Sequence, residues 1–412
     1  MINVLEFSYG IKEEMKTTNE LDIILTHGDA DGLVGASLYC VTNRLMNKMI
    51  KSTRPYIVLS SLVATSEETD KMIERAADFI FGRSITYKLH KLPKVIRLIV
   101  IDRPSPSLEM LKTLERMSIE VEHADRSVTV DIFDHHETNV KHHEEVLEFT
   151  EHISDKTYLD STTNFCGARH VWNYMNDILK SNSEHIINLE RMVKGTEELV
   201  NTTNNWDTFL WTDLDEEYKR EEAIAIQAAD KLLGAQLFWN KLRDRLNDLY
   251  NSSNITNVWR IFRDDIWICH EIFNNKLNNE YIRVVYQIKP ENIIDIKGYN
   301  CALLTADPEY QSMLAHQLFL NYDGNIVDRP KIDVIIYINA TGSISIRSRK
   351  DIPVKSNELA NVIGTTFGYG GGGHPSAAGG RIMAAEDHYK VLKDMVKRGV
   401  DDYAFGIQLW RR

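Results

Sequence analysis

Three short segments of the chain bring acidic and histidine side chains together. Residues 26–32 read THGDADG, residues 97–102 read RLIVID and residues 133–138 read FDHHET. Carboxylate and imidazole groups are suitable ligands for divalent metal ions. A cluster of that many carboxylates without cations would be electrostatically unfavourable. If the segments meet in space, their residue types therefore indicate metal-assisted chemistry.

In the first segment, His27, Asp29 and Asp31 alternate with smaller residues. An extended chain would place the three side chains on one face, where they would make half of a metal site. Gly32 would permit the tight turn that follows. A polar turn with Asp31 capping the next helix would explain this stretch alone equally well.

The other candidate acids follow changes in polarity along the chain. Asp102 ends one apolar run, and Asp134, His135 and His136 end another. A lone acid in the position of Asp102 is more often a turn or cap residue. Asp207, in NNWDTFLWT, could equally be a helix cap or a solvent-facing acid. Together the five acids and three histidines suit two divalent ions about 3.5–4 Å apart that share a bridging carboxylate.

A glycine-rich stretch, GYGGGGHPSAAGG, occupies residues 368–380. Consecutive glycines lose conformational entropy on folding, which is worthwhile where backbone N–H groups must approach a phosphate. A flexible linker is the competing interpretation, but linkers seldom carry His-Pro-Ser-Ala-Ala. Upstream, alternation along SISIRSRKD places Arg347 and Arg349 on one face, where they could meet an anion unless the charges are simply solvated.

The apolar patterns predict the elements that must position these groups. Apolar runs at 21–26, 56–62, 97–102 and 128–134 predict strands, and helical patterns lie between them. Alternating strands and helices predict an α/β fold with a doubly wound, mostly parallel sheet. Functional groups collect at the carboxyl ends of the strands in such sheets. We therefore expect strand ends near positions 27, 102, 134 and 207 to converge on a pair of cations.

The chain has 412 residues, of which 43% are hydrophobic, so it can form more than one domain. We predict a catalytic domain over residues 1–210. An apolar stripe at helical spacing predicts a helical connector or insert over 211–296. Further strand and helix patterns predict a smaller α/β domain over 297–412.

Composition narrows the class of protein. A net charge of −12 argues against a protein that coats long nucleic acids through a basic surface. The four cysteines are far apart, which predicts buried thiols in place of a disulfide framework or a zinc ribbon. The sequence contains no run of about 18 apolar residues and does not begin as a secretory signal does. We therefore expect a cytoplasmic protein without a membrane partner.

The motifs together resemble those of the DHH/DHHA1 phosphoesterase superfamily, which includes RecJ exonucleases, nanoRNases and cyclic-dinucleotide phosphodiesterases. THGDADG is similar to the first motif, the strand ending in Asp102 to the second, DHH at 134–136 to the third, and the segment around Asp207 to the fourth. IRS at 346–348 and the glycine-rich stretch resemble the DHHA1 signature. The sequence departs from the family pattern after Asp102, where Arg-Pro-Ser-Pro replaces small residues.

The resemblance implies two divalent ions, with Mn²⁺ favoured over Mg²⁺ because the ligands include histidine. The ligands of the first ion would be His27, Asp29 and Asp102. The ligands of the second ion would be Asp31, Asp102, His135 and Asp207, so that Asp102 is the bridge. The resemblance also implies that His136 contacts the scissile phosphate and can donate a proton, and that Asp134 orients the histidines. The implied substrate-binding residues of the C-terminal domain are Arg347, Ser348, Gly371, Gly372, Gly373 and His374.

The resemblance implies a two-metal phosphodiesterase, and we expect an exonuclease that releases nucleoside monophosphates from short single-stranded RNA or DNA. The partners we expect are such oligonucleotides, and the sequence is also compatible with a homodimer. A RecJ-like exonuclease of single-stranded DNA is an alternative, favoured by tryptophans such as Trp211, Trp239, Trp259 and Trp267 if these stack on bases instead of filling the core. A cyclic-dinucleotide or nucleoside bisphosphate phosphatase is another enzymatic alternative. A non-catalytic scaffold is less favoured, because every expected ligand position holds a competent residue.

Overall fold

A computed structural model provides the structure of the chain. It describes residues 1–7, 20–49, 54–81, 93, 95–119, 127–147, 154–160, 164–181, 187–252, 254–296, 298–325, 329–339, 342–382 and 389–410. The chain divides into two compact units, Met1–Glu271 and Ile272–Arg412. Each unit is described by itself.

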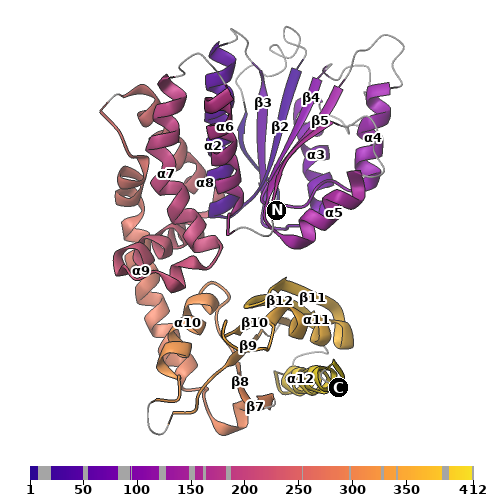
Figure 1. Ribbon diagram of the computed structural model, residues 1–412, viewed down its shortest axis with the longest axis vertical. Coiled ribbons are helices and arrows are strands. Elements are labelled where there is room, and N and C mark those ends of the chain that lie inside the picture. The colour runs from indigo at the N-terminus through magenta and orange to yellow at the C-terminus, as the bar shows by residue number, and fades with distance from the viewer. Residues whose placement is uncertain are drawn as a thin grey trace. The chain divides into compact units, whose positions relative to one another are not determined.

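The first unit is built on a six-stranded sheet (Figure 1). Its strands are β1 (Asn3–Phe7), β2 (Glu20–His27), β3 (Tyr56–Ser61), β4 (Val95–Ile101), β5 (Ser127–Asp134) and β6 (Ser154–Leu159). Their order across the sheet is β1-β3-β2-β4-β5-β6, and only β1 is antiparallel to its neighbour. This arrangement confirms the predicted mostly parallel sheet.

Helices cover both faces of this sheet (Figure 1). The helices of the unit are α2 (Ala30–Met49), α3 (Ser66–Phe81), α4 (Leu108–Ile119), α5 (Glu137–Leu147), α6 (Gly167–Ser181), α7 (Ile187–Asp207), α8 (Glu217–Asn251) and the start of α9 (Val258–Val285), with a short 3₁₀ helix at Leu210–Asp213. Helices α3 and α4 bury Met72, Ile73 and Leu111 against one face. Helices α2 and α6 pack on the other face (Figure 1). Because the inner strands are covered on both sides, their sequences are almost continuously apolar.

The helical pattern that predicted a connector belongs largely to the first unit. Helix α8 packs against α2 and α7 and buries Ala228, Trp239 and Leu242. Gly234 interrupts α8 with φ 69° and ψ 164°, a conformation that glycine adopts at little cost. The predicted boundaries at 210 and 296 therefore differ from the division at Glu271, because the apolar stripe of α8 is buried within the first unit.

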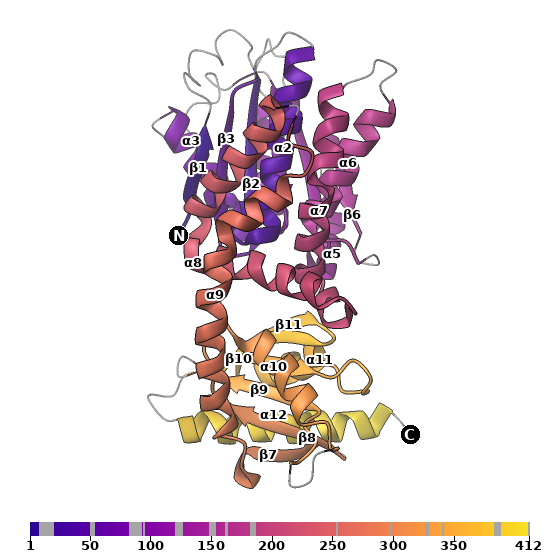
Figure 2. The same ribbon diagram turned by 90° about the vertical axis from the view of Figure 1, so that its left-hand side faces the viewer.

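The second unit has its own six-stranded sheet (Figure 2). Its strands are β7 (Ile293–Ile296), β8 (Tyr299–Leu304), β9 (Val334–Ile338), β10 (Ser343–Ser348), β11 (Gly368–His374) and β12 (Ala377–Ile382), in the order β11-β12-β10-β9-β8-β7. Only β8 and β9 pair in parallel. Helices α11 (Ser356–Phe367) and α12 (Tyr389–Trp410) cover the apolar face, and the unit also contains α10 (Gln311–Asn321) and a short 3₁₀ helix at Pro290–Asn292.

The glycine-rich stretch forms a strand hairpin, not the flexible linker that was the competing interpretation. Strand β11 pairs antiparallel with β12, and β11 also packs against α11. A Cβ atom on Gly371 would collide with the carbonyl oxygen of Ala360 in α11. Gly373 has a φ of 136°. These glycines therefore allow helix and strand backbones to approach closely and the hairpin to turn.

Candidate metal centre

The acidic and histidine motifs meet at one edge of the first sheet. Strands β2, β4 and β5 are parallel neighbours, so their carboxyl ends lie side by side. His27 is the last residue of β2, Asp134 is the last residue of β5, and Asp102 follows β4 directly. The alternation of His27, Asp29 and Asp31 predicted an extended chain after His27, but α2 begins at Ala30. Asp31 instead lies in the first turn of α2, whose start is capped by the carboxylate of Asp29.

Three groups of these side chains lie close enough to hold metal ions. Within each group, one ligand atom from every member lies within 4.8 Å of the others. The groups are His27, Asp29 and Asp102; Asp31, His135 and Asp207; and Asp102, Asp134, His135 and His136. Asp102 belongs to two groups, and its two oxygens face different histidines. Its Oδ2 is 3.5 Å from Nδ1 of His27, and its Oδ1 is 3.7 Å from Nε2 of His135.

The backbone of Asp102 is strained in a way that aims its carboxylate. Its φ is 54°, in the left-handed region that residues other than glycine seldom adopt. Its amide donates a hydrogen bond of 2.8 Å to the carbonyl of Phe133, which ties the turn to the neighbouring strand. Such strain persists only where the surrounding structure holds it, and it is concentrated at functional sites.

Asp31 is held by the beginning of α6. Its two carboxylate oxygens accept hydrogen bonds of 2.8 Å from the amides of Gly167 and Ala168. A Cβ atom on Gly167 would lie 3.0 Å from the Asp31 carboxylate and 3.0 Å from the Asp102 side chain. The sequence analysis missed this glycine, whose only signal is its position at the start of a helical pattern.

Asp207 reaches the centre from a helix. The sequence analysis expected a strand end near this position, but Asp207 is the last residue of α7. Its Oδ2 is 3.0 Å from Nε2 of His135. One turn earlier, the side chain of Asn204 accepts a hydrogen bond from the amide of Cys166 and donates one to the carbonyl of Asn164. The end of α7 is thereby fixed to the segment that leads into α6.

Asp134 and His136 form a separate hydrogen-bonded pair within the cluster. The buried Asp134 Oδ1 accepts hydrogen bonds from the amides of His135 and His136 and is 2.9 Å from His136 Nδ1. Its Oδ2 accepts a hydrogen bond from Asn139. Asp134 therefore fixes the backbone of both histidines and the ring of His136.

The electrostatics of the cluster indicate that it is suited to cations. Burial and the neighbouring Asp29 raise the pKa of Asp102 to about 7. Burial alone would lower the pKa of His27 and His135, but nearby carboxylates raise these values to about 12 and about 10. The buried Oδ1 of Asp102 accepts no hydrogen bond from any residue that the structure describes. The converging carboxylates and imidazoles, with this buried oxygen left to accept a cation, therefore fit divalent ions.

Helix α8 brings two further charged residues near the cluster that the sequence analysis did not identify. Asp230 is buried, and its Oδ2 is 3.0 Å from Nζ of Lys231. Burial raises the pKa of Asp230 to about 6, with a further contribution from Asp29. Lys231 in turn is among the groups that hold the pKa of Asp29 below its usual range against the effect of burial. These residues had no local motif to mark them.

In the second unit, Arg347 is a cation surrounded by neutral groups. Its guanidinium donates hydrogen bonds to Ser345 Oγ, to the carbonyl of Ile346 and to Ser312 Oγ, at 2.8, 2.9 and 3.0 Å. Its Nε has no hydrogen-bond partner within the described residues. Burial lowers the pKa of this guanidinium. An anion at this position would offset the desolvation of the charge.

Two of the residues expected beside an anion have structural contacts instead. Ser348 is buried, because alternation along β10 points it away from the Arg347 face. Its hydroxyl contacts Ser356 Oγ and donates to the carbonyl of Pro375, which holds the turn after His374. Arg349 lies beyond the end of β10 and donates to the carbonyls of Ile332, Phe319 and Tyr322. Arg347 and Arg349 both reach α10, as the alternation predicted, but the donors of Arg349 are occupied by backbone carbonyls.

The other predicted substrate residues lie on the hairpin. Gly371 is half-buried under α11, whereas Gly372 and Gly373 are exposed. The backbone of His374 ends β11, and its side chain lies outside the described part of the structure.

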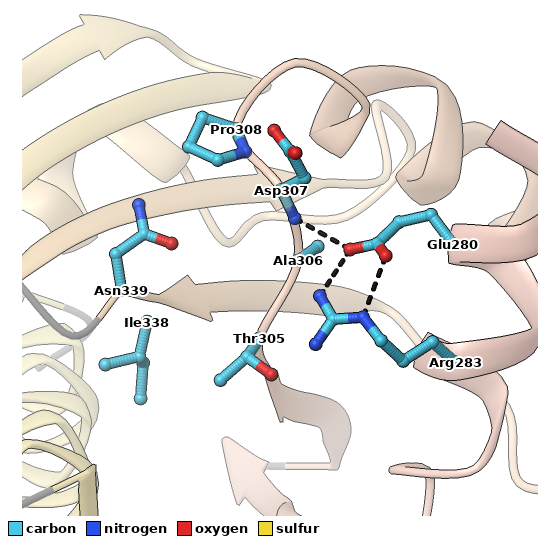
Figure 3. A pocket seen from close by; sticks show the side chains of 8 residues that line it. All are labelled: Glu280, Arg283, Thr305, Ala306, Asp307, Pro308, Ile338 and Asn339. Atoms are coloured by element: carbon cyan, nitrogen blue, oxygen red, sulfur yellow. Dashed lines mark hydrogen bonds and ion pairs between the residues drawn. The ribbon is translucent and has the colours of Figure 1, made fainter. Parts of the chain in front are cut away.

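A cavity of about 510 Å³ lies elsewhere in the second unit (Figure 3). Its lining residues are Glu280, Arg283, Thr305, Ala306, Asp307, Pro308, Ile338 and Asn339. In Figure 3 the Arg283 guanidinium faces the Glu280 carboxylate, which also accepts a hydrogen bond of 2.8 Å from the amide of Asp307. The cavity is at the end of β9, whereas Arg347 pairs with Ile335 near its beginning. None of the predicted substrate residues lines it.

Other sequence expectations concern the interior. Trp211, Trp239 and Trp259 are buried, so they are core residues and not platforms for bases, whereas Trp267 is half-buried. Cys40, Cys166, Cys269 and Cys301 are buried free thiols, as predicted. Among the helices in the described residues, none combines the length and apolar character needed to cross a membrane.

Comparisons with known proteins identify one domain and a shared fold. Residues 313–399 match the DHHA1 domain. No curated protein matches the chain. A solved structure described as the DHH domain of a member of the s1p family of ribosomal proteins is 12% identical, with a TM-score of 0.59 over 97% of this chain and 93% of that one. RecJ from Thermus thermophilus, in complex with Mn²⁺, is also 12% identical, with a TM-score of 0.50 over 98% of this chain and 55% of RecJ. At these identities the two structures establish a shared fold.

Proposed function

We propose that this chain is a member of the DHH/DHHA1 phosphoesterase superfamily and a metal-dependent phosphodiesterase that hydrolyses short oligonucleotides to nucleoside monophosphates. The match of residues 313–399 to the DHHA1 domain supports the proposal. The observation that carries the proposal is the convergence of two potential metal-binding groups, one around His27 and one around His135, on opposite oxygens of Asp102. When bound, two divalent ions would acidify a water molecule and neutralise charge on a phosphoryl group.

The residues around the cluster have distinct roles in this proposal. The ligands would be His27, Asp29 and Asp102 for one ion and Asp31, Asp102, His135 and Asp207 for the other. We infer Mn²⁺ because the donors mix imidazole with carboxylate, although Mg²⁺ is also compatible with the oxygen donors. The fixed positions of Asp31 and Asp102 would hold the ligand set in place before substrate arrives.

His136 is the group that we propose to contact the substrate. Its side chain is 41% exposed, whereas that of His135 is 5% exposed. Burial lowers the pKa of His136, but hydrogen bonding to Asp134 raises it to about 9. Asp134 therefore favours the protonated ring, and we propose that His136 donates a proton to the leaving oxygen of a phosphodiester.

The net charge of the chain and the burial of three tryptophans favour short substrates over long ones. The net charge of −12 argues against a protein that binds a long strand through a basic surface. Trp211, Trp239 and Trp259 are buried and cannot stack on bases. In the second unit, the desolvated Arg347 is suited to a phosphate of the substrate, and Gly372, Gly373 and His374 on the hairpin could contribute further contacts.

A RecJ-like exonuclease acting on single-stranded DNA is the second candidate, supported by the shared fold with RecJ. The chain spans about half the length of that protein, at 55%.

The proposal is tested by offering the protein, with Mn²⁺, a length series of end-labelled RNA and DNA from dinucleotides upward, beside cyclic dinucleotides. We expect the highest kcat/KM on the shortest linear RNA and loss of activity in His135→Ala. Preference for long DNA would favour the RecJ-like alternative. Mn²⁺ binding without hydrolysis of any of these substrates would overturn the proposal and favour a scaffold.

A further inference from the structure

The segment that departs from the family pattern, Arg-Pro-Ser-Pro at 103–106, is buried beside the metal centre. Arg103 is 0% exposed and Ser105 is 1% exposed. Arginine is almost never fully buried unless its donors are satisfied, because desolvation of the guanidinium is costly. The segment immediately follows the strained Asp102.

The guanidinium of Arg103 joins separate elements of the first unit. Its Nη1 donates a hydrogen bond of 3.1 Å to the carbonyl of Thr26, the residue before His27. Its Nη2 donates one of 3.1 Å to the carbonyl of Val63, just beyond the end of β3. Its Nε donates one of 3.0 Å to Thr69 Oγ1 in α3. One side chain therefore fixes the end of β4 relative to the ends of β2 and β3.

Ser105 links the same segment to the histidine motif. Its hydroxyl is 2.7 Å from Nδ1 of His143, and both side chains are buried. His143 lies in α5, which begins directly after His136. Thr69 strengthens the connection, because its hydroxyl also donates to the carbonyl of Pro104 at 3.0 Å.

We infer that Arg103 is a positioning residue for the metal centre, an inference that rests on the proposed function. By holding the β2 and β4 ends together, it sets the distance between His27 and Asp102 and keeps the left-handed turn at Asp102 from relaxing. The three acceptors lie around one planar fork, a geometry that a lysine ammonium cannot reproduce. The permanent positive charge also lies close to the site carboxylates without occupying a ligand position.

The test compares Mn²⁺ affinity, measured by calorimetry, in wild-type protein and Arg103→Lys. We expect the dissociation constant to rise about tenfold to a hundredfold, as when other residues that orient metal ligands are changed. In the activity assay kcat should fall while KM for the oligonucleotide stays unchanged, because Arg103 does not reach the substrate. Thr69→Val, which removes the acceptor of Arg103 Nε and the donor to the Pro104 carbonyl, should weaken Mn²⁺ binding severalfold and serves if Arg103→Lys does not fold.

The matched control is Ser107→Ala. The Ser107 hydroxyl accepts a hydrogen bond from the amide of Met110 and so caps α4, but it contacts none of the ligand-bearing strand ends. This variant should lower the unfolding temperature and leave Mn²⁺ affinity unchanged. Wild-type Mn²⁺ affinity in both Arg103→Lys and Thr69→Val, or an equal loss of affinity in Ser107→Ala, would overturn the inference alone. Failure of the wild-type protein to bind Mn²⁺ would overturn the proposed function and the inference together.

Discussion

The two adjacent histidines show how neighbouring residues acquire different chemistry. His135 is buried between Asp102 and Asp207, whereas His136 is more exposed and hydrogen-bonded to Asp134. The carboxylates raise the pKa of both rings against the opposing effect of burial. The inner ring is therefore placed to bind a cation, and the outer ring is placed to hold a proton.

This arrangement predicts that a rise in pH lowers the stability of the metal-free protein and increases the stabilisation by Mn²⁺. Because the folded-state pKa of His135 is about 10, above its ordinary 6.5, its contribution to stability is complete below pH 6.5 and is lost as the pH rises towards 10. In chelator, the unfolding temperature should therefore fall from about pH 6.5 to about pH 9. Mn²⁺ binding requires neutral imidazoles, so the increase in unfolding temperature caused by Mn²⁺ should grow over the same range. Scanning fluorimetry with and without Mn²⁺ measures both trends, and a Mn²⁺ effect independent of pH would contradict them.

At the scale of elements, close backbone contacts determine where the glycine-rich hairpin can form. Helix α11 lies directly against β11, and the missing side chain of Gly371 makes room for the carbonyl of Ala360. Gly372, its neighbour in the same strand, has open space where a Cβ atom would lie. The same run of glycines therefore contains positions with different structural requirements.

The contrast predicts different stabilities for two neighbouring substitutions. Gly371→Ala should destabilise the protein by about 1–3 kcal/mol, because the new methyl group forces helix and strand apart. Gly372→Ala should change the free energy of unfolding by less than about 1 kcal/mol, since nothing opposes the methyl group. Urea denaturation of the two variants provides the comparison. Equal destabilisation by both would show that the contact with α11 is not the reason for Gly371.

At the scale of the whole molecule, the proposed metal ligands and the predicted substrate-binding residues belong to different units. Every candidate metal ligand belongs to Met1–Glu271, and the predicted substrate-binding residues belong to Ile272–Arg412. Each unit has its own apolar core, one around β2 and β4 and the other around β9 and β10. Metal binding should therefore stabilise one unit directly.

Hydrogen exchange followed by mass spectrometry tests this division. Addition of Mn²⁺ to the full chain, without substrate, should slow exchange in peptides that contain the ends of β2, β4 and β5 and the end of α7. Exchange in the sheet of the second unit should not change, because none of the proposed ligands lies there. The His135→Ala variant is the control, and it should show weaker protection at the same Mn²⁺ concentration. Strong Mn²⁺-dependent protection confined to β8–β12 would contradict the assignment.

The sequence alone determined the parallel sheet and the strand ends at His27, Asp102 and Asp134, and it showed the resemblance to the DHH/DHHA1 motifs, because apolar periodicity and short motifs are local properties of a chain. Only the tertiary structure decided that Asp31 and Asp207 reach the centre from helices, that α8 packs on the first unit, and that the glycines form a hairpin under α11. It also decided the burial of Arg103 and the approach of Lys231, neither of which belongs to a local motif. These features depend on contacts between residues far apart in sequence, whose energies no local pattern records.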